Sequence, residues 1–289
     1  MAHMGSILVR YAEIGLKSRS VRRRFESILI DNLMSSLAYE GIEGLVSSEY
    51  GRIFIEVDDA PSAISALSRV FGVASVSPVL RCSSDMEEMK KRIAELSVPL
   101  IEEGQSFAVR ARRIGNHPFT SVDLGRELGS AVYVANERKG IRVDLTNPDL
   151  EIFVEVREKK AYLFHTFVPG PGGLPLGSQG RVVALLEKES DALAAWLIMK
   201  RGCKAIALGS EDSAAVRILR SWDHHLKVLD PADLSEAVRR YRAHAAVFGL
   251  RLADFERIKG IRLTVPAFFP LIGMGDSEIN IRLQRIKAP

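Results

Sequence analysis

The sequence predicts a protein of mixed fold class, with α+β domains in its amino-terminal half and a parallel α/β domain at its carboxyl-terminal end. Two observations lead to this prediction. Strand and helix patterns first follow the order of a ferredoxin-like split βαβ unit, and after residue 176 short apolar strands alternate with helices. A length of 289 residues, with 47% hydrophobic and 26% charged residues, fits two or three globular domains.

The first domain is predicted over residues 7–82. Apolar side chains recur there at helical spacing, at Phe25, Ile28, Leu29, Leu33 and Leu37. Alternating or β-branched runs predict strands over 7–10, 52–57 and 73–80, and helices are predicted over 18–39 and 60–71. This order is that of a ferredoxin-like domain.

The second domain is predicted over residues 83–168. The patterns predict helices over 85–100 and 121–136, with Ser121 as an N-cap, and strands over 106–112, 141–143, 151–155 and 161–164. A segment rich in proline and glycine, residues 169–177, then predicts a linker.

The third domain is predicted over residues 176–289. Apolar strands are expected over 181–186, 205–208, 226–229 and 263–265, with helices over 191–201 and from 234 onward. Continuous apolar strands between helices are typical of a parallel sheet that is covered on both faces.

Composition excludes several protein classes. Two cysteines, Cys82 and Cys203, are too few for a disulfide framework or a cysteine-rich zinc site, and we expect no metal. So few cysteines are typical of a reduced, intracellular chain, so we expect a cytoplasmic protein. No apolar run reaches the ~18 residues of a membrane span, so we expect no membrane partner. The net charge is +4, with −1 in residues 1–168 and +5 in residues 169–289, so a nucleic-acid prediction must rest on local clusters.

A first cluster of cations opens the predicted helix over 18–39. It consists of Lys17, Arg19, Arg22, Arg23 and Arg24. Positive charge at a helix N-terminus opposes the helix dipole by roughly a few tenths of a kcal/mol. Cations beside free backbone N–H groups suit phosphate, so the cluster predicts phosphate contacts. The alternative is a solvated helix face.

A second cluster follows the strand predicted over 106–112. It contains Arg110, Arg112 and Arg113, followed by Thr120 and by Arg126 in the next helix. Arginine binds phosphate through two parallel hydrogen bonds, so this cluster also predicts phosphate contacts. The alternative is an edge strand that its charges keep soluble.

Segments spread over nearly the whole chain carry a family resemblance. They are 9–18 (VRYAEIGLKS), 22–26 (RRRFE), 70–73 (VFGV) with 77–78 (SP), 107–129 with its PFTS step, 172–177 (GGLPLG), 196–202 (WLIMKRG) and 270–274 (PLIGM). Together they resemble the ThiI family of tRNA 4-thiouridine synthetases. The resemblance implies a THUMP domain over 83–168, a truncated PP-loop ATP pyrophosphatase-like domain over 176–289, and a tRNA ligand that is bound near its acceptor end.

The chain departs from this family where the nucleotide loop is expected. The family pattern Ser-Gly-Gly-x-Asp-Ser aligns with Glu187, Lys188, Glu189, Ser190, Asp191 and Ala192, of which only Asp191 matches. Glycines let backbone N–H groups approach pyrophosphate closely, and side chains prevent that approach. A carboxylate ~4 Å from a phosphate costs ~4 kcal/mol at an effective dielectric constant of about 20. The sequence therefore predicts a degenerate ATP site.

Two functions and a structural alternative follow. The first is a tRNA-binding protein of this family whose ATP site is lost and which acts with a separate catalytic or sulfur-carrier protein. The second is an active ATP-dependent tRNA sulfurtransferase with a remodelled loop, which would use ATP and Mg, with Asp191 and Cys203 as catalytic residues. Cys203 is instead expected to be a buried structural residue. The resemblance also implies a homodimer, and a dimeric scaffold with incidental arginines is the structural alternative.

Overall fold

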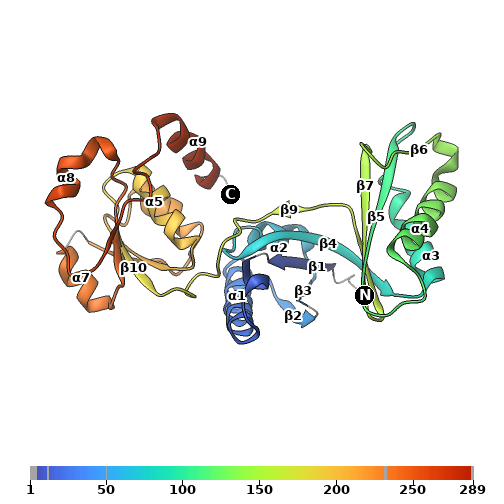
Figure 1. The fold of residues 1–289 in the computed structure, drawn as a ribbon, viewed down its shortest axis with the longest axis horizontal. Helices are drawn as coiled ribbons and strands as arrows, with labels where there is room; N and C mark the ends of the chain where they lie inside the picture. The colour runs from blue at the N-terminus through green and yellow to red at the C-terminus, as the bar shows by residue number, and fades with distance from the viewer. Residues whose placement is uncertain (1–4, 12, 50, 231–232, 288–289) are drawn as a thin grey trace. The chain divides into compact units, whose positions relative to one another are not determined.

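The computed structural model describes residues 5–11, 13–49, 51–230 and 233–287. Figure 1 shows its helices and strands. Its contacts divide the chain into two compact units, which we describe separately. Unit 1 comprises residues 1–8, 45–60 and 77–168, and unit 2 comprises residues 9–44, 61–76 and 169–289. The predicted mixture of ferredoxin-like, THUMP and parallel α/β folds is confirmed. The boundaries of three domains at 7–82, 83–168 and 176–289 stay a prediction.

One mixed sheet runs through the amino-terminal part of the described chain. Its strands are β1 (Gly5–Tyr11), β2 (Gly44–Glu49), β3 (Arg52–Val57), β4 (Val73–Ser83), β5 (Ser106–Ile114), β6 (Arg142–Val143), β7 (Leu150–Arg157), β8 (Lys160–Phe164) and β9 (Val168–Pro169). They lie in the order β2-β3-β1-β4-β8-β7-β5-β6, and β9 pairs with β4. The helical elements are η1 (Glu13–Leu16), α1 (Arg19–Tyr39), α2 (Ala60–Leu67), α3 (Met86–Ser97), α4 (Ser121–Asn136) and η2 (Glu137–Lys139).

In unit 1, α3 and α4 cover one face of the paired strands β5, β7 and β8 (Figure 1). β5 runs parallel to β7, with Arg112 opposite Glu155, and β7 runs antiparallel to β8. Leu124 and Leu128 of α4 are fully buried against the strands. The buried amide of Asn136 donates hydrogen bonds to Ser97 Oγ and to the Val132 carbonyl, which joins the ends of the two helices.

Helix α1 of unit 2 confirms the predicted apolar stripe. Phe25, Leu29, Leu33 and Leu37 are buried, because positions three or four residues apart share one helix face. The polar face begins with the predicted cations, and the first turn of α1 carries no carboxylate.

The carboxyl-terminal part of unit 2 is an open parallel sheet. Its elements are β10 (Arg181–Leu185), α5 (Glu189–Met199), β11 (Lys204–Leu208), α6 (Ala214–Arg220), β12 (Lys227–Leu229), α7 (Leu234–Tyr241), β13 (Ala245–Val247), η3 (Leu252–Asp254), α8 (Phe255–Gly260), β14 (Ala267–Phe268) and α9 (Asp276–Lys287). Among the described residues the strand order is β12-β11-β10-β13-β14, and every pair is parallel. The order reverses between β10 and β13, and folds of this kind bind ligands at the carboxyl ends of the strands beside that reversal.

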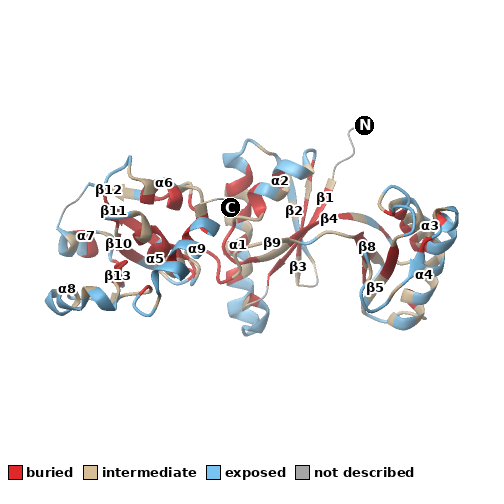
Figure 2. Cartoon of the chain, turned by 90° about the horizontal axis from the view of Figure 1, so that it is seen from above, coloured by how far each residue is buried: buried red, intermediate tan, exposed pale blue. Residues whose placement is uncertain are grey.

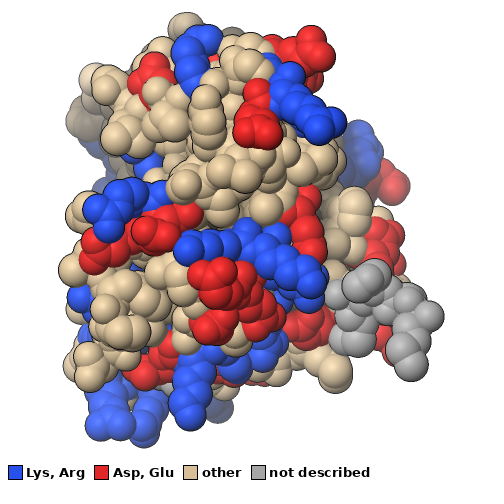
Figure 3. All heavy atoms as spheres, turned by 90° about the vertical axis from the view of Figure 1, so that its right-hand side faces the viewer, with Lys and Arg blue, Asp and Glu red and all other residues tan. Residues whose placement is uncertain are grey.

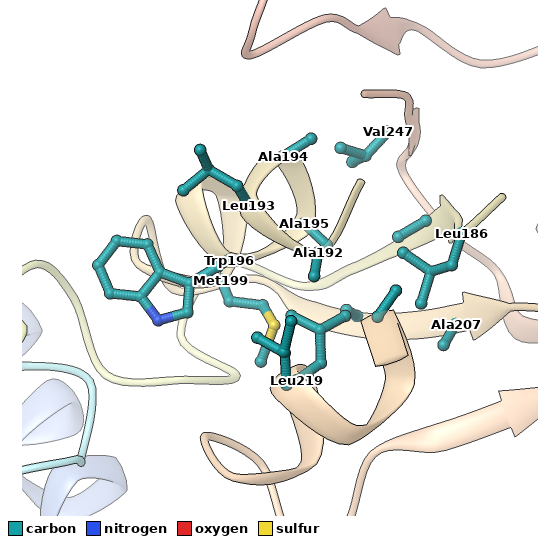
Figure 4. Close-up of a cluster of buried hydrophobic side chains, with 14 of the residues drawn as sticks. Leu186, Ala192, Leu193, Ala194, Ala195, Trp196, Met199, Ala207, Leu219 and Val247 are labelled. Atoms are coloured by element: carbon teal, nitrogen blue, oxygen red, sulfur yellow. The ribbon is translucent and has the colours of Figure 1, made fainter. Parts of the chain in front are cut away.

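Side chains of β10 alternate between two apolar layers. Val182 and Ala184 face the cluster that contains α5, α6 and α9, whereas Val183 faces the cluster that contains α7. α5 is buried along most of its length (Figure 2) because α6 and α9 pack on it as well. Figure 4 shows this cluster, with Met199 of α5 pointing toward Leu219 of α6.

Two local predictions are wrong. The N-cap of α4 is Thr120 rather than Ser121, because the Thr120 hydroxyl accepts a hydrogen bond from the Asp123 N–H. The strand expected over 263–265 lies instead at β14, where Ala267 and Phe268 pair with β13. No helix in the described ranges is long and apolar enough to cross a membrane.

Candidate functional site

The first predicted cluster lies on the exposed start of α1. Lys17, Arg19 and Arg23 are exposed, and within the described part of the chain none of them forms an ion pair. Arg22 instead donates hydrogen bonds to the carbonyls of Gly15 and Lys17, at 2.8 and 3.4 Å. Arg22 therefore fixes the turn before the helix, and its neighbours stay available to an anion.

A groove of about 590 Å³ lies between α4 and β5 in unit 1. Gly125 and Gly129, one helical turn apart on α4, both line it. A Cβ atom added at Gly129 would meet nothing within 4 Å, and one at Gly125 would come no closer than 3.8 Å to Ala111 Cβ. The absence of side chains at these two positions hollows the groove.

The groove has apolar walls and arginines among its lining residues. Val122 is 79% exposed, Leu145 67% and Tyr133 46%, although these are large apolar or aromatic side chains. Arg110 and Arg126 also line the groove, and Arg110 Nε lies 2.7 Å from Glu151 Oε1. An aromatic ring among apolar side chains, with cations nearby, suits a planar group that carries phosphate.

A second hollow, of about 250 Å³, shares Ser121 with the groove and is strongly basic. Four arginines line it together with one carboxylate, and the charged lining residues are Arg52, Arg112, Arg113, Arg157 and Glu155. We call this hollow the basic pocket. Four positive charges against one negative charge favour an anion.

Glu155 holds part of the basic pocket together. It is buried, and its carboxylate lies 3.0 Å from the buried Arg157 and 3.7 Å from Arg52. Arg112 and Arg113 form no ion pair within the described part of the chain, and Arg113 donates to the Gly115 carbonyl. Basic and acidic side chains are interspersed on the face of the molecule seen in Figure 3. Their charges largely cancel in a sum over the surface, so a local basic pocket must be identified from its lining residues.

Two predicted residues beside the groove have local partners. The Thr120 hydroxyl donates to Asp123 Oδ2 at 2.7 Å while it caps α4, and this hydrogen bond lowers the pKa of Asp123. Arg126 lies 3.4 Å from Asp123 and is mostly exposed. Thr120 thus positions the helix, and the exposed guanidinium of Arg126 is accessible to a ligand.

The predicted nucleotide loop follows β10 and is closed by its own side chains. Asp191 Oδ2 accepts hydrogen bonds from the backbone N–H groups of Glu187 and Lys188, both at 2.8 Å. Asp191 is buried, and burial raises the pKa of its carboxyl group while these hydrogen bonds oppose the rise. Two backbone donors of the loop are therefore already in use.

Both other carboxylates of the loop hold cations from later helices. Glu187 pairs with Arg257 of α8 at 2.9 Å, and Glu189 pairs with Lys287 of α9 at 2.8 Å. A Cβ at Gly249, which follows β13, would lie 2.0 Å from Asp191 Oδ1, so the chain fills the space beside that carboxylate. All three carboxylates of the loop thus already have partners within the chain.

Cys203 lies away from this loop. Cys203 precedes β11, whose far end, Leu208, pairs with Leu185 before the loop. At ~3.3 Å per residue, Cys203 lies ~16 Å from the loop end of the strand. Cys203 is partly rather than fully buried, and burial raises the pKa of its thiol. Burial also raises the pKa of Cys82, to about 11.

A raised pKa disfavours the thiolate, which is the nucleophilic form of cysteine. Within the described ranges no three His, Cys, Asp or Glu side chains group together to hold a metal ion.

Several residues that line the groove and the basic pocket were not predicted from the sequence. Arg52 and Arg157 lie 105 positions apart, and the sheet brings them together. Gly125 and Gly129 could have indicated the groove from the sequence. A glycine inside a helix destabilises it by about 1 kcal/mol relative to alanine, so two of them in one predicted helix indicate a packing or binding role.

Comparison with known proteins agrees with this architecture. The ThiI ferredoxin-like domain family matches residues 6–77, and the THUMP domain family matches residues 83–166. A probable tRNA sulfurtransferase of Methanosarcina acetivorans is 50% identical over 200 residues, which cover 68% of this chain and 48% of that protein. A probable tRNA sulfurtransferase of Methanobrevibacter smithii is 41% identical over 213 residues, which cover 72% and 54%. The chain thus spans about half the length of these relatives.

Two solved structures share the fold over nearly the whole chain. PH1313 from Pyrococcus horikoshii superposes with a TM-score of 0.84 and 29% identity, over 98% of this chain and 99% of that one. A 4-thiouridine synthetase, solved as an RNA complex with bound ATP, superposes with a TM-score of 0.78 and 24% identity, over 98% and 85%. With its ThiI ferredoxin-like domain, its THUMP domain and its parallel carboxyl-terminal sheet, the chain belongs to the ThiI family.

Proposed function

We propose that this chain binds tRNA near its acceptor end and that its carboxyl-terminal domain does not use ATP. The observation that carries the first part is the basic pocket, where Arg112 and Arg113 sit beside Arg52 and Arg157 against one carboxylate. Arginine in such a hollow recognises phosphate, and RNA helices are recognised chiefly through shape and backbone contacts.

The groove between α4 and β5 extends this proposal to unpaired nucleotides. It adjoins the basic pocket at Ser121, and Tyr133 offers a ring on which a base can stack. A single strand whose phosphate lies in the basic pocket would place a neighbouring base in the groove. The acceptor end of tRNA supplies both a duplex and an unpaired 3′ end.

The second part rests on the closed loop after β10. Asp191 occupies the N–H groups of Glu187 and Lys188, and the other loop carboxylates pair with cations of α8 and α9. The named relatives are probable tRNA sulfurtransferases, and the matched residues make up about half of their length. A chain that binds tRNA without ATP chemistry would act with a separate catalytic or sulfur-carrier protein.

Filter binding of tRNA over a series of salt concentrations tests the first part. Replacing Arg112 and Arg113 by Gln should weaken binding and lower the slope of log K against log salt by roughly one per lost phosphate contact. Lys91→Gln with Lys159→Gln removes the same charge from exposed positions of unit 1 and serves as the control. Equal behaviour of the two double variants would contradict the assignment.

Titration calorimetry with ATP and Mg, with and without tRNA, tests the second part. We expect no heat of binding under either condition. Release of pyrophosphate in the presence of tRNA would instead establish the alternative, an active ATP-dependent sulfurtransferase with a remodelled loop.

A further inference from the structure

Charge is segregated between the two edges of the parallel sheet in unit 2. The segments that lead into and begin the described strands are 178–181, 200–204, 221–227, 239–244 and 261–266, and they hold nine Lys or Arg residues but one carboxylate, Asp223. The segments that follow the strands are 186–191, 209–213, 230–233, 248–254 and 269–276, and they hold two Lys or Arg residues and nine carboxylates. Because the strands are parallel, the two sets lie at opposite edges.

The cations at the amino-terminal edge form a row. Arg181 at the start of β10 pairs in register with Lys204 at the start of β11, and the His244 N–H donates to the Arg181 carbonyl at 2.9 Å. Lys227 begins the next strand, β12. Neighbouring strands lie ~4.8 Å apart, so these four strand starts span about 14 Å.

We call six of these cations the basic edge: Arg181, Lys204, Lys227, Arg239, Arg240 and Arg242. All six are exposed, and none forms an ion pair within the described part of the chain. Arg239 and Arg240 lie in the last turn of α7, where cations also stabilise the helix dipole. The helix dipole does not explain the cations at the starts of β10, β11 and β12, because a sheet has only a small net dipole.

The basic edge continues the cation cluster at the start of α1. Arg24 of α1 donates a hydrogen bond to the Ser178 carbonyl at 3.0 Å, three residues before Arg181. Asn32, two turns farther along α1, donates to the Leu176 carbonyl at 3.0 Å. α1 therefore packs along the segment that leads into β10, which places Arg23 and Arg181 on neighbouring segments.

We infer that the basic edge is a second RNA-binding surface, on which the phosphate backbone of the tRNA crosses from the start of α1 to the strand starts of the carboxyl-terminal sheet. This inference rests on the proposed function, because it takes tRNA as the ligand. A polyanion fits this edge, whereas the carboxylates at the opposite edge repel one. The carboxyl-terminal domain would thus contact RNA at the edge away from the closed nucleotide loop.

A matched pair of triple variants tests the inference. The first is Arg181→Gln with Lys204→Gln and Arg242→Gln. The control is Lys259→Gln with Arg282→Gln and Arg285→Gln, which removes the same charge from exposed positions of α8 and α9. Filter binding to tRNA over a salt series should show about tenfold weaker binding and a smaller salt slope for the first variant, and at most a twofold change for the control.

A footprint on the unaltered protein gives an independent measurement that requires no variant to fold. Acetylation by a lysine reagent, followed by mass spectrometry, should show tRNA protecting Lys204 and Lys227 but not Lys259. If the unaltered protein binds tRNA but these lysines stay reactive, or if both triple variants bind equally, the inference is overturned and the proposed function stands. If the unaltered protein shows no salt-dependent tRNA binding, the proposed function itself fails.

Discussion

The imidazole ring of His224 stacks on the phenol ring of Tyr39, with ring centroids 3.7 Å apart and planes 7° from parallel. The contact joins the end of α1 to the segment before β12. Ser35, one turn earlier on α1, lies 2.9 Å from the ring of His225. Two adjacent histidines thus attach α1 to the parallel sheet of unit 2.

This attachment predicts a pH dependence. Burial, and next the charge of Arg69, lower the pKa of His224 below its usual 6.5. The unfolded chain then binds more protons than the native protein as pH falls through 6.5, so the free energy of unfolding decreases there. Urea unfolding between pH 8 and 5 should show this decrease in the free energy of unfolding, and the decrease should be smaller in His224→Asn. His225→Asn is the control, and an identical loss in both variants would contradict the assignment.

The hydrogen bonds of Asp191 predict that removing its carboxylate lowers the free energy of unfolding. Asp191→Ala leaves the N–H groups of Glu187 and Lys188 without their acceptor, and should lower the free energy of unfolding by about 1–3 kcal/mol. Asp230→Ala, at an exposed position, should change it by less than ~0.5 kcal/mol. Chemical denaturation measures both, and equal stability of the two variants would show that the loop does not depend on Asp191.

The basic pocket predicts that two carboxylates of β7 differ in their importance for folding. Glu155→Gln removes a buried partner of Arg157 and should cost about 3 kcal/mol. Glu151 pairs with Arg110 in a half-exposed setting, so Glu151→Gln should cost less than ~1 kcal/mol. Thermal unfolding of the two variants gives the comparison, and a larger loss for the exposed pair would refute this account of the pocket.

The glycine at position 129 predicts opposite effects on stability and binding. Gly129→Ala should raise the free energy of unfolding by ~0.5–1 kcal/mol, because alanine suits a helix and its Cβ meets nothing. Gly129→Leu should keep the fold but fill the groove, so that tRNA with an unpaired 3′ end binds more weakly while a blunt RNA duplex binds as before. Gly129→Ala is the binding control, and unchanged affinity in Gly129→Leu would exclude the groove as a base site.

The sequence predicted those parts that depend on neighbours along the chain. The stripe through Leu29, Leu33 and Leu37 is enough to define α1 and its buried face, because helical spacing repeats over six turns. The continuous apolar run through Val182 and Val183 likewise predicts a strand that is covered on both faces. The short strands β13 and β14 have three and two residues, too few for any periodicity to appear.

The sites were less predictable because they join distant segments. The ion pair of Glu187 with Arg257 spans 70 positions, so no local pattern shows that the loop carboxylate has a partner. Arg112 was predicted from its own strand, whereas Arg52 depends on the strand order of the sheet for its place in the same pocket. The row of strand-start cations likewise appears only once the strands are known to be parallel.

The segregation of charge in the parallel sheet also affects how the protein meets its ligand. A domain that is positive at one edge and negative at the other has a large dipole moment, which the modest total charge of +4 conceals. In the electric field of a polyanion such a domain experiences a torque as well as an attraction. The torque orients the basic edge toward the RNA before the two molecules make contact. Productive encounters should then be more frequent than random collision allows, and added salt should slow association more than it speeds dissociation.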